Sequence, residues 1–141
     1  MCSAPRFFAS FGHLPFVNVE ELLEEARAGL HRLTPEQSFD AIRSGDAVVV
    51  DIREEERRRH DGRVPGAVEI ARNVLEWRCA PQSEFRDRRV SDPSRVVIVM
   101  CNEGYQSSLA AAALQRLGLP QATDMDGGFQ RWRADGLPVE D

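Results

Sequence analysis

The chain has 141 residues, of which 42% are hydrophobic and 29% charged, and its formal charge is −5 at pH 7. This composition argues against a disordered chain and is typical of one globular domain with a hydrophobic core. The negative charge argues against nucleic-acid binding, and we expect neither a membrane span nor a signal peptide. Three cysteines, Cys2, Cys79 and Cys101, are too few and too irregularly spaced for a disulfide framework or a zinc site, so we expect a reducing, cytoplasmic setting.

The amino-terminal part contains signals for two helices and a short strand. A helix is predicted over residues 18–29, starting at an N-capping asparagine, and a short strand over residues 30–33. A second helix is predicted over residues 34–44, because Thr34 and Gln37 form a capping-box pattern around a proline at the first helical position.

Strands and helices alternate along the rest of the chain. The strand candidates are residues 47–52, 67–71, 96–100 and 122–126. The helix candidates are residues 54–60, 73–78, 107–118 and 128–136. This alternation predicts an α/β fold in which a parallel sheet is flanked by helices on both faces, with right-handed crossovers.

The charged run over residues 54–60 can form ion pairs four residues apart, Glu54 with Arg58 and Glu55 with Arg59. We interpret this run as a solvated helical face rather than as a binding patch.

Cys101 follows the apolar run Val96–Met100 directly, and a short polar loop then leads into an alanine-rich helix. Ligands of parallel α/β sheets bind beyond the carboxyl ends of the strands, where a helix N-terminus and converging backbone amides stabilise negative charge. A thiolate is such a charge. Taken alone, a cysteine at a strand end is also consistent with one more buried apolar residue. The loop favours a functional cysteine, because Gly104 permits a tight curl and no large aliphatic residue follows until Leu109.

Three motifs, in this order, resemble those of the rhodanese-like domain family. Residues 48–67 contain an apolar strand that ends in Asp-x-Arg, then a Gly-x-x-Pro-Gly-Ala turn. Residues 101–108, CNEGYQSS, resemble the family's active-site loop, Cys-x-x-Gly-x-Arg-Ser. Residues 126–139, DGGFQRWRADGLPV, resemble its closing signature.

The resemblance covers roughly residues 30 to 139. We therefore expect an N-terminal tail and helix over residues 1–29 and a rhodanese-like domain over residues 30–141. The fold that the resemblance implies is a five-stranded parallel sheet with flanking helices.

The activity implied by the resemblance is sulfur transfer without a metal or an organic cofactor. Cys101 would attack a sulfane sulfur, become a persulfide and pass that sulfur to a thiol or cyanide. The donor is a small molecule, and the acceptor is a thiophilic small molecule or a protein. The implied substrate-binding loop, whose backbone amides would hold the terminal sulfur, consists of Asn102, Glu103, Gly104, Tyr105, Gln106 and Ser107.

The loop departs from the family pattern where thiosulfate users carry arginine, because Gln106 stands there and Glu103 adds a negative charge. A dianionic donor should bind less well to such a loop. Arg72 and Arg78 follow the third predicted strand at the same sheet edge, so we include Arg72 among the substrate-binding candidates. An equally good interpretation is that both arginines only hydrate a helix.

Other polar, aromatic and sulfur-containing residues are assigned structural roles. Asp51 and Arg53 are expected to hold a turn, and Cys79 is expected to be buried or a bystander. Trp77 and Trp132 are interpreted as core and packing aromatics rather than as a stacking platform.

Two other functions are considered. The first is a non-catalytic, sulfur-relay or regulatory module of the same fold whose cysteine docks a partner protein. The second is phosphatase chemistry, which needs Cys-x5-Arg to bind phosphate; the sixth residue after Cys101 is Ser107, so this chemistry is disfavoured.

Overall fold

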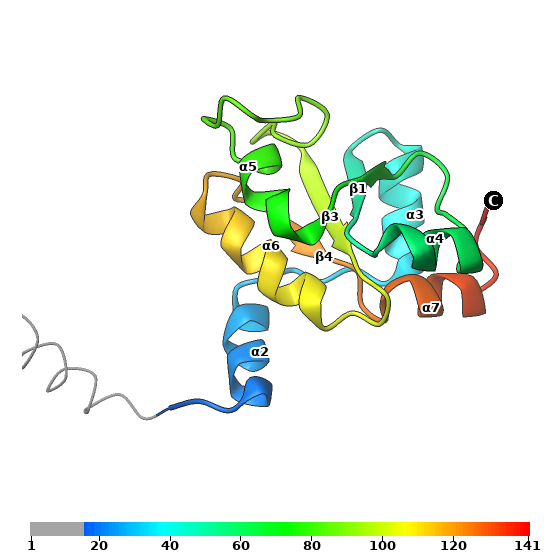
Figure 1. Ribbon diagram of the computed structural model, residues 1–141, viewed down its shortest axis with the longest axis horizontal. Coiled ribbons are helices and arrows are strands. Elements are labelled where there is room, and N and C mark those ends of the chain that lie inside the picture. Colours follow the sequence, from blue (N-terminus) through cyan, green and yellow to red (C-terminus); the bar gives the residue numbers. More distant parts are fainter. Residues whose placement is uncertain (1–15) are drawn as a thin grey trace, which may run out of the picture.

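The computed structural model describes residues 16–141, so the predictions made for Cys2 and the rest of the tail lie outside the described residues. The elements, shown in Figure 1, are α2 (Val19–Ala28), α3 (Pro35–Arg43), β1 (Ala47–Asp51), α4 (Glu55–Asp61), β2 (Val68–Glu69), the 3-10 turn η1 (Arg72–Val74), α5 (Leu75–Cys79), β3 (Val96–Met100), α6 (Gln106–Arg116), β4 (Thr123–Asp124) and α7 (Gly128–Ala134).

The helix starts follow the capping signals of the sequence. The Asn18 side chain accepts a hydrogen bond from the Glu21 N–H at 2.8 Å, and Thr34 Oγ1 accepts one from the Gln37 N–H at 3.1 Å. In both helices the third-residue side chain accepts a hydrogen bond from the N-cap backbone in return, so each has a full capping box. The predicted starts of α2 and α3 are therefore confirmed.

The sheet is parallel throughout, with the order β2-β1-β3-β4. Within the described residues it has four strands, so the prediction of five was wrong. The missing strand is residues 30–33, of which only Leu33 pairs, in a parallel bridge with Met125. Because Thr34 already caps α3, the extended segment ends before it can form a longer ladder.

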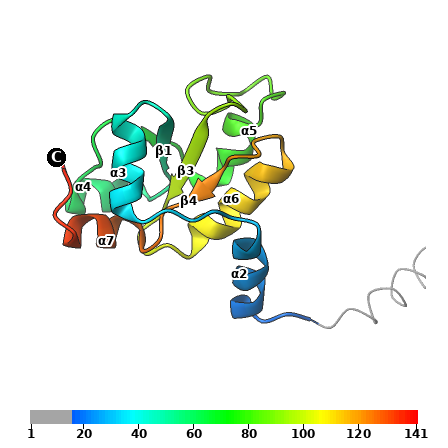
Figure 2. The same ribbon diagram turned by 180° about the vertical axis from the view of Figure 1, so that it is seen from behind.

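Helices cover both faces of the sheet, as predicted. Helices α5 and α6 lie on one face, while α3 and α7 lie on the other, as the two opposite views show (Figures 1 and 2). Alternate residues of β3 serve the two faces: Val97 and Val99 pack with α5 and α6, whereas Ile98 and Met100 pack in the cluster of α3 and α7. None of the described helices is long and apolar enough to cross a bilayer.

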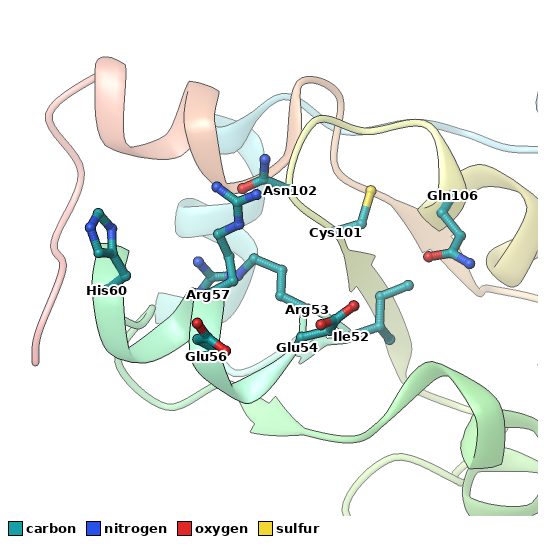
Figure 3. Close-up of a pocket in the computed structure, with 9 residues that line it drawn as sticks. All are labelled: Ile52, Arg53, Glu54, Glu56, Arg57, His60, Cys101, Asn102 and Gln106. Carbon is teal, nitrogen blue, oxygen red and sulfur yellow. The ribbon is translucent and has the colours of Figure 1, made fainter.

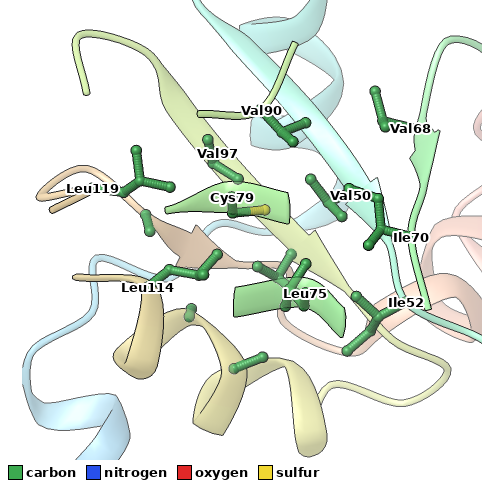
Figure 4. Packing of buried hydrophobic residues seen from close by; sticks show 14 of the residues in the cluster. Val50, Ile52, Val68, Ile70, Leu75, Cys79, Val90, Val97, Leu114 and Leu119 are labelled. Carbon is green, nitrogen blue, oxygen red and sulfur yellow. The ribbon is translucent and has the colours of Figure 1, made fainter. Parts of the chain in front are cut away.

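Cys79, the last residue of α5, lies in the core that α5 and α6 form with the sheet, near Leu75, Leu114 and Val97 (Figure 4). It is fully buried, and this burial raises the pKa of its thiol to about 12. The expectation of a buried cysteine is thus confirmed.

The two tryptophans differ. Trp132 is buried, meets Phe39 edge-on at 5.8 Å between ring centroids, and donates its indole N–H to the Pro138 carbonyl. Trp77 is 56% exposed, so its assignment to the core was wrong. The short helix α5 turns Leu75 and Cys79, four residues apart, toward the core, which leaves Trp77 on the opposite side.

A buried ion pair holds the turn after β1, as predicted. The Arg53 guanidinium donates to both carboxylate oxygens of Asp51, with a shortest distance of 2.8 Å, and also to the Gly62 carbonyl. It stacks over the Phe129 ring, with the guanidinium carbon 3.8 Å from the centroid. Arg58 Nη1 lies 3.8 Å from the same carboxylate, so Asp51 serves two buried arginines.

Of the two predicted ion pairs in α4, one forms. Arg59 pairs with Glu55 at 3.3 Å, as expected. Arg58 is 7% exposed and pairs with Glu55 and Glu69 instead of Glu54, because Glu54 is the N-cap residue and precedes the helix. The solvated-face interpretation was therefore wrong for Arg58.

We predict that Asp51→Asn lowers the free energy of unfolding by about 3–5 kcal/mol, because two buried guanidinium groups lose their carboxylate. Urea denaturation measures the change. The matched control, Asp40→Asn, alters an exposed carboxylate and should change stability by less than about 0.5 kcal/mol. Equal effects of the two substitutions would contradict the structural role of Asp51.

Candidate functional site

Cys101 follows β3 directly, at the carboxyl edge of the sheet, and residues 102–105 curl back before α6 begins at Gln106. The N–H groups of Gly104 and Ser107 point at its sulfur, with N···Sγ distances of 3.1 and 3.4 Å. The residue is buried, with an exposed fraction of 7%. Backbone donors converging on a sulfur at a helix start stabilise negative charge on it.

The curl of the loop depends on glycine at position 104. Its φ is +90°, and a Cβ there would come within 2.7 Å of the Gly127 nitrogen. The loop therefore packs directly against the turn that leads into α7. Backbone bonds close the contact: the Phe129 N–H donates to the Cys101 carbonyl at 2.9 Å and the Gln130 N–H to the Asn102 carbonyl at 3.0 Å.

A pocket of about 570 Å³ opens beside the sulfur (Figure 3). Ile52, Arg53, Glu54, Glu56, Arg57 and His60 line it on one side, and Cys101, Asn102 and Gln106 on the other. The charged groups come from α4 and the turn before it, so the face that we expected to be merely solvated lines the pocket. Arg57 lies 3.7 Å from Asp61, which partly offsets its charge, and the carboxylates of Glu54 and Glu56 make the pocket mixed in sign.

The predicted loop residues present different groups. Glu103, Tyr105 and Gln106 are exposed, and the Asn102 side chain accepts a hydrogen bond from Gln130 Nε2 at 2.9 Å. Ser107 is buried, and its hydroxyl donates to Asp124 at 2.7 Å, so it offers its N–H rather than its side chain to the sulfur.

Arg72 is not among the residues that line the pocket of Cys101. It binds Glu76 at 3.0 Å and lines a neighbouring pocket of about 500 Å³, which Gln106 also lines. Arg78 donates to the Phe85 carbonyl and lies 3.5 Å from Asp87. Arg72 therefore brings its positive charge to a pocket that Gln106 lines but that Cys101 does not line.

Three residues beneath the loop were missed from the sequence. Asp124, the fully buried last residue of β4, accepts hydrogen bonds from Ser107, Ser108 and Arg32. Arg27, on α2, and Arg32 both donate to the Gly104 carbonyl. A charged residue inside a predicted strand was the one available signal for Asp124; the arginines carry none, because their partners are distant in sequence.

Comparison with known proteins gives the following similarities. The family model of the rhodanese-like domain matches residues 34–135. The thiosulfate sulfurtransferase GlpE of Actinobacillus succinogenes is 33% identical over 108 residues, which cover 77% of this chain and 88% of that protein. The GlpE protein of Glaesserella parasuis is 32% identical over 108 residues, covering 77% of this chain and 91% of its own.

Two solved structures extend the comparison. A Rhodopseudomonas palustris protein of unknown function, described as a possible tyrosine phosphatase, is 31% identical with a TM-score of 0.79, covering 90% of this chain and 99% of that one. The polysulfide-sulfur transferase homodimer of Wolinella succinogenes is 23% identical, with a TM-score of 0.69 and coverage of 97% and 91%, and shows a shared fold.

We predict that Gly104→Ala slows alkylation of Cys101 by iodoacetamide about tenfold or more, because the new Cβ clashes with the Gly127 backbone and pushes the amide donors away from the sulfur. The rate is measured at pH 7 by mass spectrometry of the cysteine-containing peptides.

The matched control is Gly45→Ala. Gly45 has a similar φ of +83°, but no described atom lies within 4 Å of the place that a Cβ would occupy there. This substitution carries the backbone strain without the clash, so it should lower stability by about 1–3 kcal/mol and leave the alkylation rate of Cys101 unchanged. Equal alkylation rates in the two variants would contradict the importance of the close packing at Gly104.

Proposed function

The chain belongs to the rhodanese-like domain family, a family that includes sulfurtransferases, and from this premise we propose that it is a sulfurtransferase with Cys101 as its nucleophile. A small-molecule donor supplies a sulfane sulfur, and a thiol or cyanide accepts it. A protein can also be the acceptor. A thiolate nucleophile needs a reducing compartment, in keeping with the expected cytoplasmic location.

The proposed reaction has two displacement steps. The Cys101 thiolate attacks the outer sulfur of the donor, a new S–S bond forms, and the donor leaves with the electron pair of its broken S–S bond; from thiosulfate the leaving group is sulfite. The acceptor thiolate or cyanide then attacks the terminal sulfur of the persulfide, and Cys101 leaves as a thiolate. Electrons balance without a metal or an external oxidant.

The observation that carries this proposal is the pair of backbone N–H groups on Cys101 Sγ, at 3.1 and 3.4 Å, beside an open pocket. The same donors that stabilise the thiolate are positioned to stabilise a persulfide anion that extends into the curl of the loop. A buried structural cysteine would need neither the converging amides nor the pocket.

The charges around the pocket bear on the donor. Arg57 and His60 line it, but Glu54 and Glu56 line it too, and Glu103 is exposed on the loop. Repulsion by these carboxylates disfavours a compact dianion such as thiosulfate more than a persulfide of a small thiol. We therefore propose a thiol persulfide as the better donor, with Arg72 able to assist an anionic group bound near Gln106.

Two alternatives receive different support. A module that relays sulfur to, or docks, a partner protein is supported by the 61% exposed aromatic ring of Tyr105 on the loop. Phosphatase chemistry, suggested by the description of the Rhodopseudomonas protein, has less support. Ser107 stands where a phosphate-binding arginine would be needed, and its hydroxyl is bound to Asp124.

We predict that Cys101→Ser abolishes sulfur loading, because the hydroxyl is a far weaker nucleophile at neutral pH. Intact-mass analysis after incubation with thiosulfate or glutathione persulfide measures the added sulfur. The control is Cys79→Ser. The Cys79 thiol is buried and its pKa is raised to about 12, so the folded variant should load sulfur as the wild type does. Loading of the Cys101→Ser protein would contradict the single-nucleophile mechanism.

Gln106→Arg should raise kcat/KM for thiosulfate by about ten- to a hundredfold, since a charge-assisted contact to the sulfonate is worth roughly 1.5–3 kcal/mol. Steady-state kinetics with thiosulfate and a thiol persulfide give the comparison. Gln106→Met, which has a similar length but no charge, controls for the loss of the amide. An equal gain with both donors would contradict a charge effect.

A further inference from the structure

The carbonyl oxygen of Gly104 is held by two guanidinium groups. Arg27 Nη2 lies 2.7 Å from it and Arg32 Nη2 lies 3.0 Å from it. Arg27 is on α2 and Arg32 is in the segment between α2 and α3, so both precede residue 34, where the family match begins. Helix α2 lies beside α6, as Figure 1 shows, which brings Arg27 to the loop.

The direction of this carbonyl matters for the sulfur. In a trans peptide the C=O of one residue and the N–H of the next point in opposite directions, so the Tyr105 N–H points away from the two arginines. The N–H that Gly104 donates to Cys101 Sγ belongs to the preceding peptide, 103–104, which is joined to the held 104–105 peptide through the Gly104 Cα. Glycine has wide conformational freedom, so the peptide between Gly104 and Tyr105 could flip. The Gly104 carbonyl would then point to the side that the Tyr105 N–H now faces. Two cationic donors on the oxygen oppose that flip.

Side chains of β4 and α6 hold both arginines in place. Arg32 binds both carboxylate oxygens of Asp124, at 2.9 and 3.2 Å, and Arg27 Nε donates to Ser108 Oγ at 3.0 Å. Ser108 in turn donates to Asp124 at 2.8 Å. One buried carboxylate therefore connects both arginines, the start of α6 and β4.

Arg32 also places charge close to the sulfur. Burial opposes its charged form, but the hydrogen bond and charge of Asp124, together with Asp126 and Cys101, raise the pKa of Arg32 above its ordinary value. It stays a cation at every pH at which the protein works.

We propose that Arg27 and Arg32 are positioning residues of the active site, which fix the Gly104 peptide so that the amides of the loop face the sulfur of Cys101. Helix α2 is thereby a functional part of the site rather than a separate tail. The inference deepens the proposed sulfur transfer and rests on it for its catalytic meaning, but the geometry can be tested without a sulfur donor.

The test is the alkylation rate of Cys101 in the full chain by iodoacetamide at pH 7, measured by peptide mass spectrometry. Arg27→Gln should slow the reaction about three- to tenfold, because the amide donors that stabilise negative charge on the sulfur are no longer held toward it. The hydrogen-bond partners of Arg27 are a carbonyl and a hydroxyl, and its guanidinium carbon lies 5.8 Å from the centroid of the Tyr105 ring. Its loss therefore leaves no carboxylate without a cation, and the variant is expected to fold. Arg27→Lys keeps one charged donor, so its alkylation rate should lie between that of the wild type and that of Arg27→Gln.

The control is Arg116→Gln, which removes an exposed arginine at the other end of α6 and should react as wild type. The direction of the change separates positioning from loss of structure, because unfolding of the chain exposes the buried Cys101 and speeds alkylation. A wild-type or faster rate in Arg27→Gln would overturn the inference. Absence of sulfur loading in the wild type would instead contradict the proposed function, while the alkylation comparison would still decide this one.

Discussion

Buried aspartates at the ends of two strands organise the site around Cys101. In the sheet order β2-β1-β3-β4, Asp51 ends β1 and Asp124 ends β4, on either side of the strand that delivers the cysteine. Both carboxylates are fully buried, and burying a charge is costly unless a partner neutralises it. Each is neutralised by an arginine, Arg53 for the first and Arg32 for the second. The sulfur between them therefore does not face an unpaired carboxylate from either aspartate.

These two pairs also tie distant parts of the chain to the same sheet edge. Arg53 reaches from the turn after β1 to the Gly62 carbonyl and to the Phe129 ring of α7. Asp124 accepts hydrogen bonds from Ser107 and Ser108 at the start of α6. The loop of Cys101 is thus framed by fixed elements, and its peptide groups are oriented before any substrate binds. Such preorganised dipoles lose no free energy to reorientation during the reaction.

The sequence was sufficient for the features that depend on local rules. Capping boxes located the starts of α2 and α3, and the β-branched runs located β1 and β3, with Cys101 at the turn that follows. The extent of pairing at residues 30–33 was not predictable in this way, because only Leu33 pairs, with the distant Met125, before Thr34 caps α3.

Features that depend on tertiary arrangement were missed or misassigned. Arg27 meets the Gly104 carbonyl from 77 positions away in the chain, and no local pattern marks such a contact. The charged residues of α4 have an ordinary solvent-facing pattern, yet the turn of the chain after β1 brings Arg57 and His60 to the pocket. Trp77 was assigned to the core from its residue type, although its neighbours at positions 75 and 79 occupy the one buried side of a five-residue helix.

The arginines on the Gly104 carbonyl lie outside the loop motif of Cys101, although they contact it. The motif at residues 101–108 lies inside the family match, whereas Arg27 and Arg32 come before it. Evolution can therefore retune the loop by changes in a helix that the motif does not contain. Transplanting the eight-residue motif into another scaffold would carry the cysteine but leave behind the two arginines that bind the carbonyl of its glycine.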